Sequence, residues 1–121
     1  MVLNGKYTVV GEENFANYLS AMGFPYNYVK YSIDIKQDSD KVTVIKSYDG
    51  KSKAVVIPLG VEYEETNALG VVVKCMARFD GDILIVQAGD VTKTYTFTPT
   101  DGNIVYKSPI SSGKLIFKSD Q

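Results

Sequence analysis

The sequence predicts a mainly β fold, a ten-stranded antiparallel up-and-down β-barrel with a two-helix lid over one end. Three observations support this fold class. Turn signals such as Asp49-Gly50 and Asp80-Gly81 recur roughly every 8–12 residues, which is the spacing of antiparallel hairpins. Helical periodicity is confined to a segment near the N-terminus. The 121 residues suffice for one domain and are too few for two, so residues 1–121 are expected to form a single domain.

The helical segment is "EENFANYLSAMGF". Its apolar positions at i, i+3, i+4 and i+7 are Phe15, Tyr18, Leu19 and Met22. Asn14 or an acid just before it is expected to cap the first turn, and Gly23 to end the helix. Pro25 suits the first position of a second short helix. Together these features predict a helix–turn–helix lid over about residues 14–33.

The remaining segments alternate like strands and are separated by the turn signals. The predicted strands cover residues 5–11, 31–37, 41–48, 52–58, 61–65, 70–79, 83–88, 92–98, 103–108 and 113–119. Closing such a sheet into a barrel hides its edges, and ten strands leave an interior wider than their side chains easily fill. The sequence therefore predicts a container, and containers of this size usually hold an apolar ligand.

Composition excludes several classes of function. A net charge of −1 argues against nucleic acid as a partner, because phosphate binding needs a basic excess. With no histidine and one cysteine, Ser-His pairs, Cys-His pairs and the usual zinc sites are impossible. Adjacent acids such as Glu64-Glu65 are expected on the solvated surface. We therefore expect no enzyme, no cofactor and no metal. The start of the chain lacks signal-peptide features, and no stretch approaches the ~18 apolar residues of a membrane span, so the cytoplasm is the expected location.

Three segments carry a resemblance to a known family. They are "GKYTVVGEENFANYLSAMG", "LGVEYEETNALG" and "VKCMARFDGDILIVQ". Their pattern resembles that of the intracellular lipid-binding family, which comprises the cytosolic fatty-acid-binding and cellular retinoid-binding proteins. The resemblance spans essentially the whole chain. It implies the family's clam-shaped barrel, related to the lipocalins and calycins, with ten strands and a two-helix lid.

The chain departs from the family pattern at the carboxylate anchor. Fatty-acid binders of this family carry Arg-x-Tyr in the last strand and a second arginine two strands earlier, and these side chains hold the ligand carboxylate. The resemblance places Leu115 and Phe117 at the terminal pair and Phe97 at the second arginine. The charged positions that follow "E-x-T" in the family fall near Leu69 and Val71. The family's neutral retinol carriers have glutamine in place of the arginines and keep a terminal phenylalanine like Phe117.

Strand parity gives an independent prediction of which side chains face inward. In the last strand Lys114 and Lys118 should face water, so Leu115 and Phe117 should point inward. The inward set predicted in this way is Phe15, Leu19, Met22, Val71, Val73, Cys75, Tyr95, Phe97, Tyr106, Leu115 and Phe117. These residues either line a ligand cavity or fill a solid core. We expect Cys75 to act as a small buried hydrophobe rather than as a nucleophile.

Two kinds of ligand stay open at this point. A buried carboxylate needs a cationic partner, so a fatty acid would place its head near the lid, in water or close to Lys30 or Lys53. A neutral retinoid, carotenoid or sterol would need one hydroxyl partner, for which Tyr48, Tyr95 and Tyr106 are candidates, although ordinary strand packing explains them equally well. The predicted ligand-binding residues are Phe15, Leu19, Met22, Phe24, Tyr28, Tyr48, Val71, Val73, Cys75, Tyr95, Phe97, Tyr106, Leu115 and Phe117.

The predicted function is that of an intracellular carrier for a hydrophobic, lipid-like ligand. Phe24 and Tyr28 are expected to gate passage through the lid. Transient contact of the lid with membranes stays open, although the lid carries few cations. We expect a monomer. The alternative is an interaction or structural protein on the same fold whose cavity is filled or unused.

Overall fold

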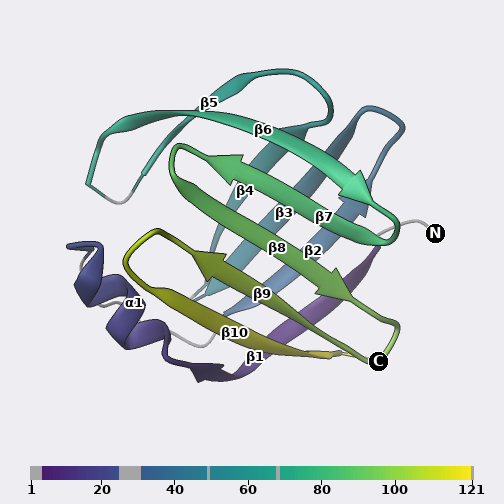
Figure 1. The fold of residues 1–121 in the computed structure, drawn as a ribbon. Coiled ribbons are helices and arrows are strands. Elements are labelled where there is room, and N and C mark those ends of the chain that lie inside the picture. The colour runs from purple at the N-terminus through teal and green to yellow at the C-terminus, as the bar shows by residue number, and fades with distance from the viewer. Residues whose placement is uncertain (1–3, 25–30, 49, 68, 121) are drawn as a thin grey trace.

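The computed structural model describes residues 4–24, 31–48, 50–67 and 69–120. Ten antiparallel strands follow each other along the chain, with one helix between the first two (Figure 1). Their bounds are β1 Gly5–Glu13, α1 Phe15–Ala21, β2 Ser32–Gln37, β3 Lys41–Tyr48, β4 Lys51–Pro58, β5 Tyr63–Thr66, β6 Val72–Asp80, β7 Ile83–Ala88, β8 Val91–Phe97, β9 Asp101–Lys107 and β10 Ser112–Ser119. The predicted fold class is thereby confirmed.

The strands form a single curved sheet in the order β4-β3-β2-β1-β10-β9-β8-β7-β6-β5. The expectation that the sheet closes and hides every edge is wrong in one respect. Among the described residues, β4 and β5 form no ladder with each other, so the barrel is nearly closed rather than closed. The two edges carry features that discourage pairing. β4 contains two lysines and ends at Pro58, while β5 is only four residues long.

The single described helix, α1, ends as the sequence predicts. Gly23 follows it with φ 74, in the left-handed region that favours glycine. The Gly23 amide donates to the Ser20 carbonyl at 3.1 Å, and the Phe24 amide donates to the Leu19 carbonyl at 2.9 Å. These two bonds make a Schellman motif, which satisfies carbonyls that the last turn leaves free.

The start of α1 differs from the prediction. The Asn14 side chain makes no capping hydrogen bond and the first turn holds no acidic residue, because Glu12 and Glu13 lie in β1. Asn14 instead has φ 56, and its Nδ2 donates to the Ser112 carbonyl at 2.7 Å, which ties the start of the helix to β10. The predicted second helix, from Pro25, falls largely on residues 25–30, outside the described residues. Residues 32 and 33, which the prediction assigned to the end of the lid, already belong to β2.

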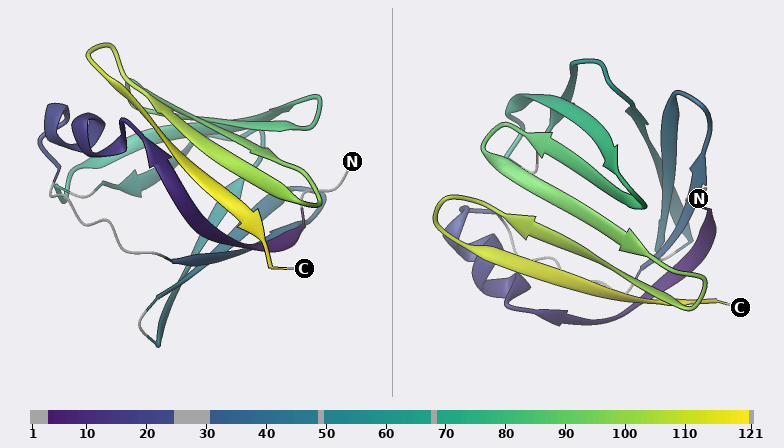
Figure 2. Two further views of the ribbon diagram at one scale, coloured as in Figure 1. Left: turned by 90° about the horizontal axis from the view of Figure 1, so that it is seen from below. Right: turned by 45° about the vertical axis from the view of Figure 1, so that its right-hand side comes forward.

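The barrel has two distinct ends. One lies beneath α1 and carries the β3–β4, β5–β6, β7–β8 and β9–β10 turns, and we call it the helix end. Asn4 and Asp120, the first and last described residues, lie at the opposite end, which we call the terminal end (Figures 1 and 2). The part of the chain that the structure describes contains no helix with the length and apolar character needed to cross a bilayer.

The inner face of the sheet follows strand parity closely. Leu115 and Phe117 are 2% and 1% exposed, while Lys118 on the opposite face is open to water. Cys75 and Ala77 are likewise buried. The core cluster contains Tyr7, Val9, Ile33, Ile35, Val42, Ile57, Ala77, Leu84, Val86, Tyr95, Phe97, Ile104, Leu115 and Phe117.

The inward position predicted for Val71 is wrong. Parity along β6 places Val73, Cys75 and Ala77 inside, but β6 begins at Val72, and Val71 lies in the preceding turn with 53% of its surface exposed. The Asn67 carboxamide oxygen accepts from the Val71 amide at 3.0 Å. This bond holds the turn in a shape that does not continue the alternation of the strand.

Candidate ligand-binding site

A pocket of about 390 Å³ lies beneath α1 at the helix end, and we call it the chamber. Its lining comes from α1, from Met22 and Phe24 just after it, and from the ends of β3 to β9 that approach the helix. The lining residues are Phe15, Tyr18, Leu19, Met22, Phe24, Lys46, Lys53, Glu65, Thr66, Asn67, Val73, Ala88, Asp90, Val91, Lys93 and Tyr106. This volume falls within the range of small-molecule sites, roughly 300–1,000 Å³.

Aromatic rings form the wall between α1 and the sheet. Tyr106 of β9 packs against Phe15 and Tyr18 of α1, with ring centroids 5.2 and 5.7 Å apart. Burial, followed by the nearby Tyr31 and Tyr18 hydroxyls and Glu65, raises the pKa of Tyr106 well above its ordinary value. Tyr106 therefore stays neutral at physiological pH and offers a flat apolar surface with one hydroxyl.

The opposite wall of the chamber is charged. Directly paired residues in antiparallel strands share a face of the sheet. Lys46 of β3 pairs with buried Ile33, and Lys93 of β8 pairs with buried Val86, so both lysines belong to the inner face. Lys53 of β4 pairs directly with Lys46 and belongs to it too.

Glu65 of β5 also belongs to the inner face, because it pairs with Val73. The expectation that Glu64-Glu65 lies wholly on the solvated surface is therefore wrong for Glu65, whose carboxylate lies 3.5 Å from the Lys93 ammonium. Glu65 also accepts a hydrogen bond from the Tyr63 hydroxyl at 3.3 Å.

Lys46 has no such acidic partner. Its ammonium lies over the Tyr31 ring, 4.1 Å from the centroid, in a cation–π contact. Burial lowers the pKa of Lys46, and the positive charges of Lys53 and Lys93 lower it further. Within the described residues neither Lys46 nor Lys53 forms a salt bridge.

Most of the predicted site residues fall into two groups. The six that line the chamber are Phe15, Leu19, Met22, Phe24, Val73 and Tyr106. Phe97, Leu115 and Phe117 instead belong to the packed core, together with Tyr95. The Phe97 ring lies 4.7 Å from Tyr7 and 5.5 Å from Phe117, measured between centroids. This half of the interior is filled by aromatic packing.

The remaining predicted residues lie elsewhere. Tyr48 is 39% exposed at the end of β3, and Val71 is exposed in its turn. Cys75 is a free, buried cysteine that does not line the chamber, and burial raises the pKa of its thiol, with Glu65 adding to the effect. Its expected burial is confirmed. Tyr28, and Lys30 as a possible head-group partner, lie outside the described residues.

Sequence reasoning missed Tyr18 and most of the charged lining. Tyr18 is 2% exposed and was part of the helical periodicity, so the signal was present. In "VTKTYTF", Lys93 alternates in phase with Tyr95 and Phe97, and this parity alone could have placed it inside. Lys46 shows the same signal, because it is in phase with Val42.

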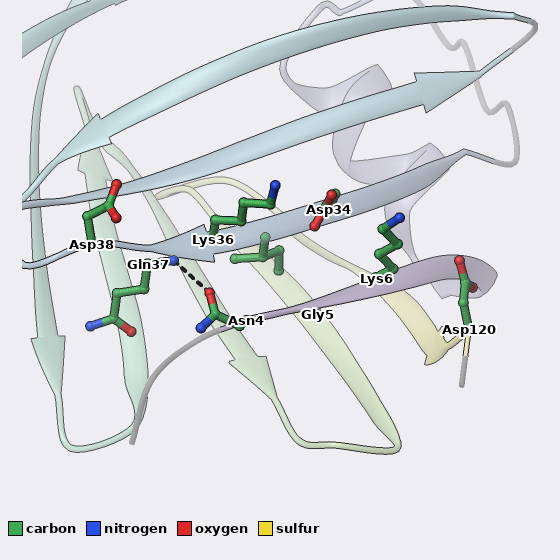
Figure 3. A pocket seen from close by; sticks show the side chains of 9 residues that line it. Asn4, Gly5, Lys6, Asp34, Lys36, Gln37, Asp38 and Asp120 are labelled. Atoms are coloured by element: carbon green, nitrogen blue, oxygen red, sulfur yellow. Dashed lines mark hydrogen bonds between the residues drawn. The ribbon is translucent and has the colours of Figure 1, made fainter.

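A second hollow, of about 600 Å³, lies at the terminal end beside β1 and β2 (Figure 3). It is lined by Asn4, Gly5, Lys6, Asp34, Ile35, Lys36, Gln37, Asp38 and Asp120. Its charged side chains alternate in sign, with Lys6 directly opposite Asp34. The Gln37 amide already donates to the Asn4 side chain at 3.0 Å. Although larger in volume than the chamber, this hollow has Ile35 as its one large apolar lining residue, and its two lysines nearly balance its three aspartates.

The described residues contain no group of three or more His, Cys, Asp or Glu side chains that could hold a metal ion. One buried polar atom has no hydrogen-bond partner among them, the Glu12 Oε2. Glu12 pairs with Leu115 at the end of β1 and does not line the chamber.

Comparison with known proteins places this geometry in context. No family model matches the chain. The liver fatty acid-binding proteins of Mus musculus and Sus scrofa are each 31% identical to it, over 88% and 98% of this chain and 95% of either relative. The solved structure of a fatty acid-binding protein from the brain tissue of Drosophila melanogaster superposes with a TM-score of 0.83 at 24% identity, covering 94% of this chain and 96% of that one. That likeness shows the fold.

Proposed function

This chain belongs to the fatty-acid-binding protein family, within the intracellular lipid-binding proteins, and we propose that it is a carrier that encloses one lipid-like molecule in the chamber. The observation that carries the proposal is the position of the chamber. Its apolar wall is made by α1 and Tyr106, so the apolar chain of a bound lipid would be covered by α1 rather than exposed to water. The carrier itself performs no chemistry, and the cytosol remains its expected location.

The filled half of the barrel favours a second candidate. Phe97, Leu115 and Phe117, which the resemblance places at the usual carboxylate anchor, are each at most 3% exposed. A protein whose whole interior were packed in this way would serve an interaction or structural role on the same fold. The chamber is the feature that argues against that role, because its lining includes half-buried apolar side chains such as Leu19 and Val73 that no other described residue covers completely.

Native mass spectrometry on protein from its natural source tests the carrier function. We expect a mass excess of one lipid-sized molecule, recovered in organic solvent after denaturation. Replacing Val73 by tryptophan should fill the chamber and remove this excess. Met76→Trp is the matched control, because Met76 lies on the same strand and is 42% exposed on the outer face. Protein that carries no ligand would support the filled-barrel alternative, whereas full retention in the Val73→Trp variant would show that the ligand binds outside the chamber.

A further inference from the structure

We propose that the ligand carries an anionic head group, and that Lys46 and Lys53, with Lys93 beside them, hold that head group inside the helix end of the barrel. This inference rests on the carrier function proposed above and specifies the polar end of its cargo. The resemblance places the family's usual anchor in the last strand at Leu115 and Phe117, which are apolar and buried in the core and so offer a carboxylate no partner.

The first argument is the placement of three lysines on the inner face. Lysine is almost never directed into a barrel unless its charge has a partner. Here the register fixes all three side chains to the inner face, and all three line the same chamber. Lys46 and Lys53 come from the neighbouring strands β3 and β4, whereas Lys93 comes from β8, which is not next to them in the sheet (Figure 2). Convergence from separate strands is what distinguishes this cluster from a row of surface lysines.

The second argument is the balance of charge. Glu65 neutralises Lys93, and the exposed side chains Asp90 and Lys53, of opposite sign, are both screened by water. Lys46 is half-buried, and neither Lys46 nor Lys53 has an acidic partner among the described residues. The chamber therefore has an uncompensated positive charge beside its apolar wall. This arrangement complements a molecule with one anionic end and one apolar chain.

The third argument is that the ligand-free arrangement is unfavourable by itself. Lys46 and Lys53 are directly opposite each other in the β3–β4 ladder, and like charges at such positions are destabilising. Burial lowers the pKa of Lys46, and the positive charge of Lys53 lowers it further. An anion between the two ammonium groups would relieve the repulsion. Both lysines are therefore better explained by binding than by stability.

Titration calorimetry with defined lipids, below their micellar concentrations, tests the inference. Oleate and oleoyl lysophosphatidate supply anionic heads, a carboxylate and a phosphate, whereas oleyl alcohol supplies a neutral head on a similar chain. We expect the unmodified protein to bind at least one anionic lipid roughly tenfold more tightly than the alcohol. The tighter of the two anionic lipids identifies the head group. Added salt should lower the affinity for the anionic lipids and leave the affinity for oleyl alcohol unchanged.

Lys46→Met and Lys53→Met remove each charge while keeping an apolar stem of similar length. Each variant should bind the anionic lipid roughly tenfold more weakly, while its affinity for oleyl alcohol should change less than about twofold. The same variants should raise the Tm of the ligand-free protein, because they remove the repulsion within the pair. Lys41→Met is the matched control on β3, since Lys41 is exposed on the outer face, and it should change neither affinity.

The outcomes separate this inference from the proposed function. Equal binding of oleyl alcohol and both anionic lipids would overturn the head-group site and leave the carrier intact. Unchanged anionic affinity in both Met variants, with the fold preserved, would do the same. Failure of the unmodified protein to bind any of the three lipids would overturn the carrier function and the head-group site together.

Discussion

Gly102 allows two phenylalanine rings to share the interior at the terminal end. It lies opposite Phe97 of β8 on one side and Phe117 of β10 on the other. A Cβ atom at this position would overlap the Phe97 ring. The absence of a side chain is therefore what lets the ring of Phe97 lie flat across β9, within 5.5 Å of the Phe117 centroid. The sequence shows Gly102 only as part of a turn signal, and its packing role appears only with the register.

Replacing Gly102 by alanine should lower the free energy of unfolding by about 1–3 kcal/mol, because the added methyl group overpacks the core. Urea denaturation followed by circular dichroism measures the change. Gly11→Ala serves as the control, since a Cβ there meets only the Ile116 side chain, at 3.9 Å. If both variants lose the same small amount of stability, the close packing of Phe97 on Gly102 is not what holds this region together.

Lys93 shows how far single residues can be predicted from sequence. The rule that lysines face water correctly orients Leu115 and Phe117 through their neighbour Lys118. The same rule fails for Lys93, whose alternation with Tyr95 places it inside. The failure has a physical cause, because the Glu65 carboxylate that accommodates the ammonium comes from a position 28 residues earlier in the chain. Local sequence does not contain that pairing.

At the scale of secondary structure, all ten strands were predicted, and their bounds differ from the observed ones by at most two residues. Turn residues and alternation determine these elements locally, which is why they can be read from sequence. The start of α1 and the position of Val71 could not be predicted in this way. Both depend on hydrogen bonds made by asparagine side chains, from Asn14 to β10 and from Asn67 within its turn.

The docking of α1 on β10 depends on Gly113. A Cβ at Gly113 would approach the Phe15 Cα to 2.8 Å and the Tyr18 Cβ to 2.9 Å. The helix backbone therefore rests directly on the strand, and this contact brings Phe15 and Tyr18 over Tyr106. The close contact with β10 therefore positions α1.

Gly113→Val should displace α1 and open the chamber while the core at the terminal end stays folded. We expect bound oleate to dissociate at least several-fold faster, as stopped-flow displacement would show. For the neutral lipid oleyl alcohol, we expect the affinity to change less than the dissociation rate. Lys118→Val, an outward substitution on the same strand, is the control. Dissociation at the unmodified rate would mean that α1 does not retain the ligand.

At the scale of the molecule, the barrel has a filled half and a hollow half. The sequence left two alternatives open, a ligand cavity or a solid core. The structure contains both, with the core cluster toward the terminal end and the chamber beneath α1. Strand parity predicts which side chains face inward, but it does not predict which of them pack against each other across the barrel and which line a cavity. That depends on the curvature of the sheet and on the unpaired edges of β4 and β5.

The central claim is that the ligand occupies the chamber and leaves the filled half unchanged. Methyl NMR during a titration with oleate tests it most directly, using protein labelled at leucine and valine. We predict that the methyl signals of Leu19 and Val73 shift strongly, because both residues line the chamber. The signals of Leu115 and Val86, 2% and 1% exposed in the core, should stay nearly fixed. Large shifts at Leu115 and Val86 with little change at Leu19 and Val73 would contradict the account, because the ligand would then lie between the phenylalanines of the terminal end.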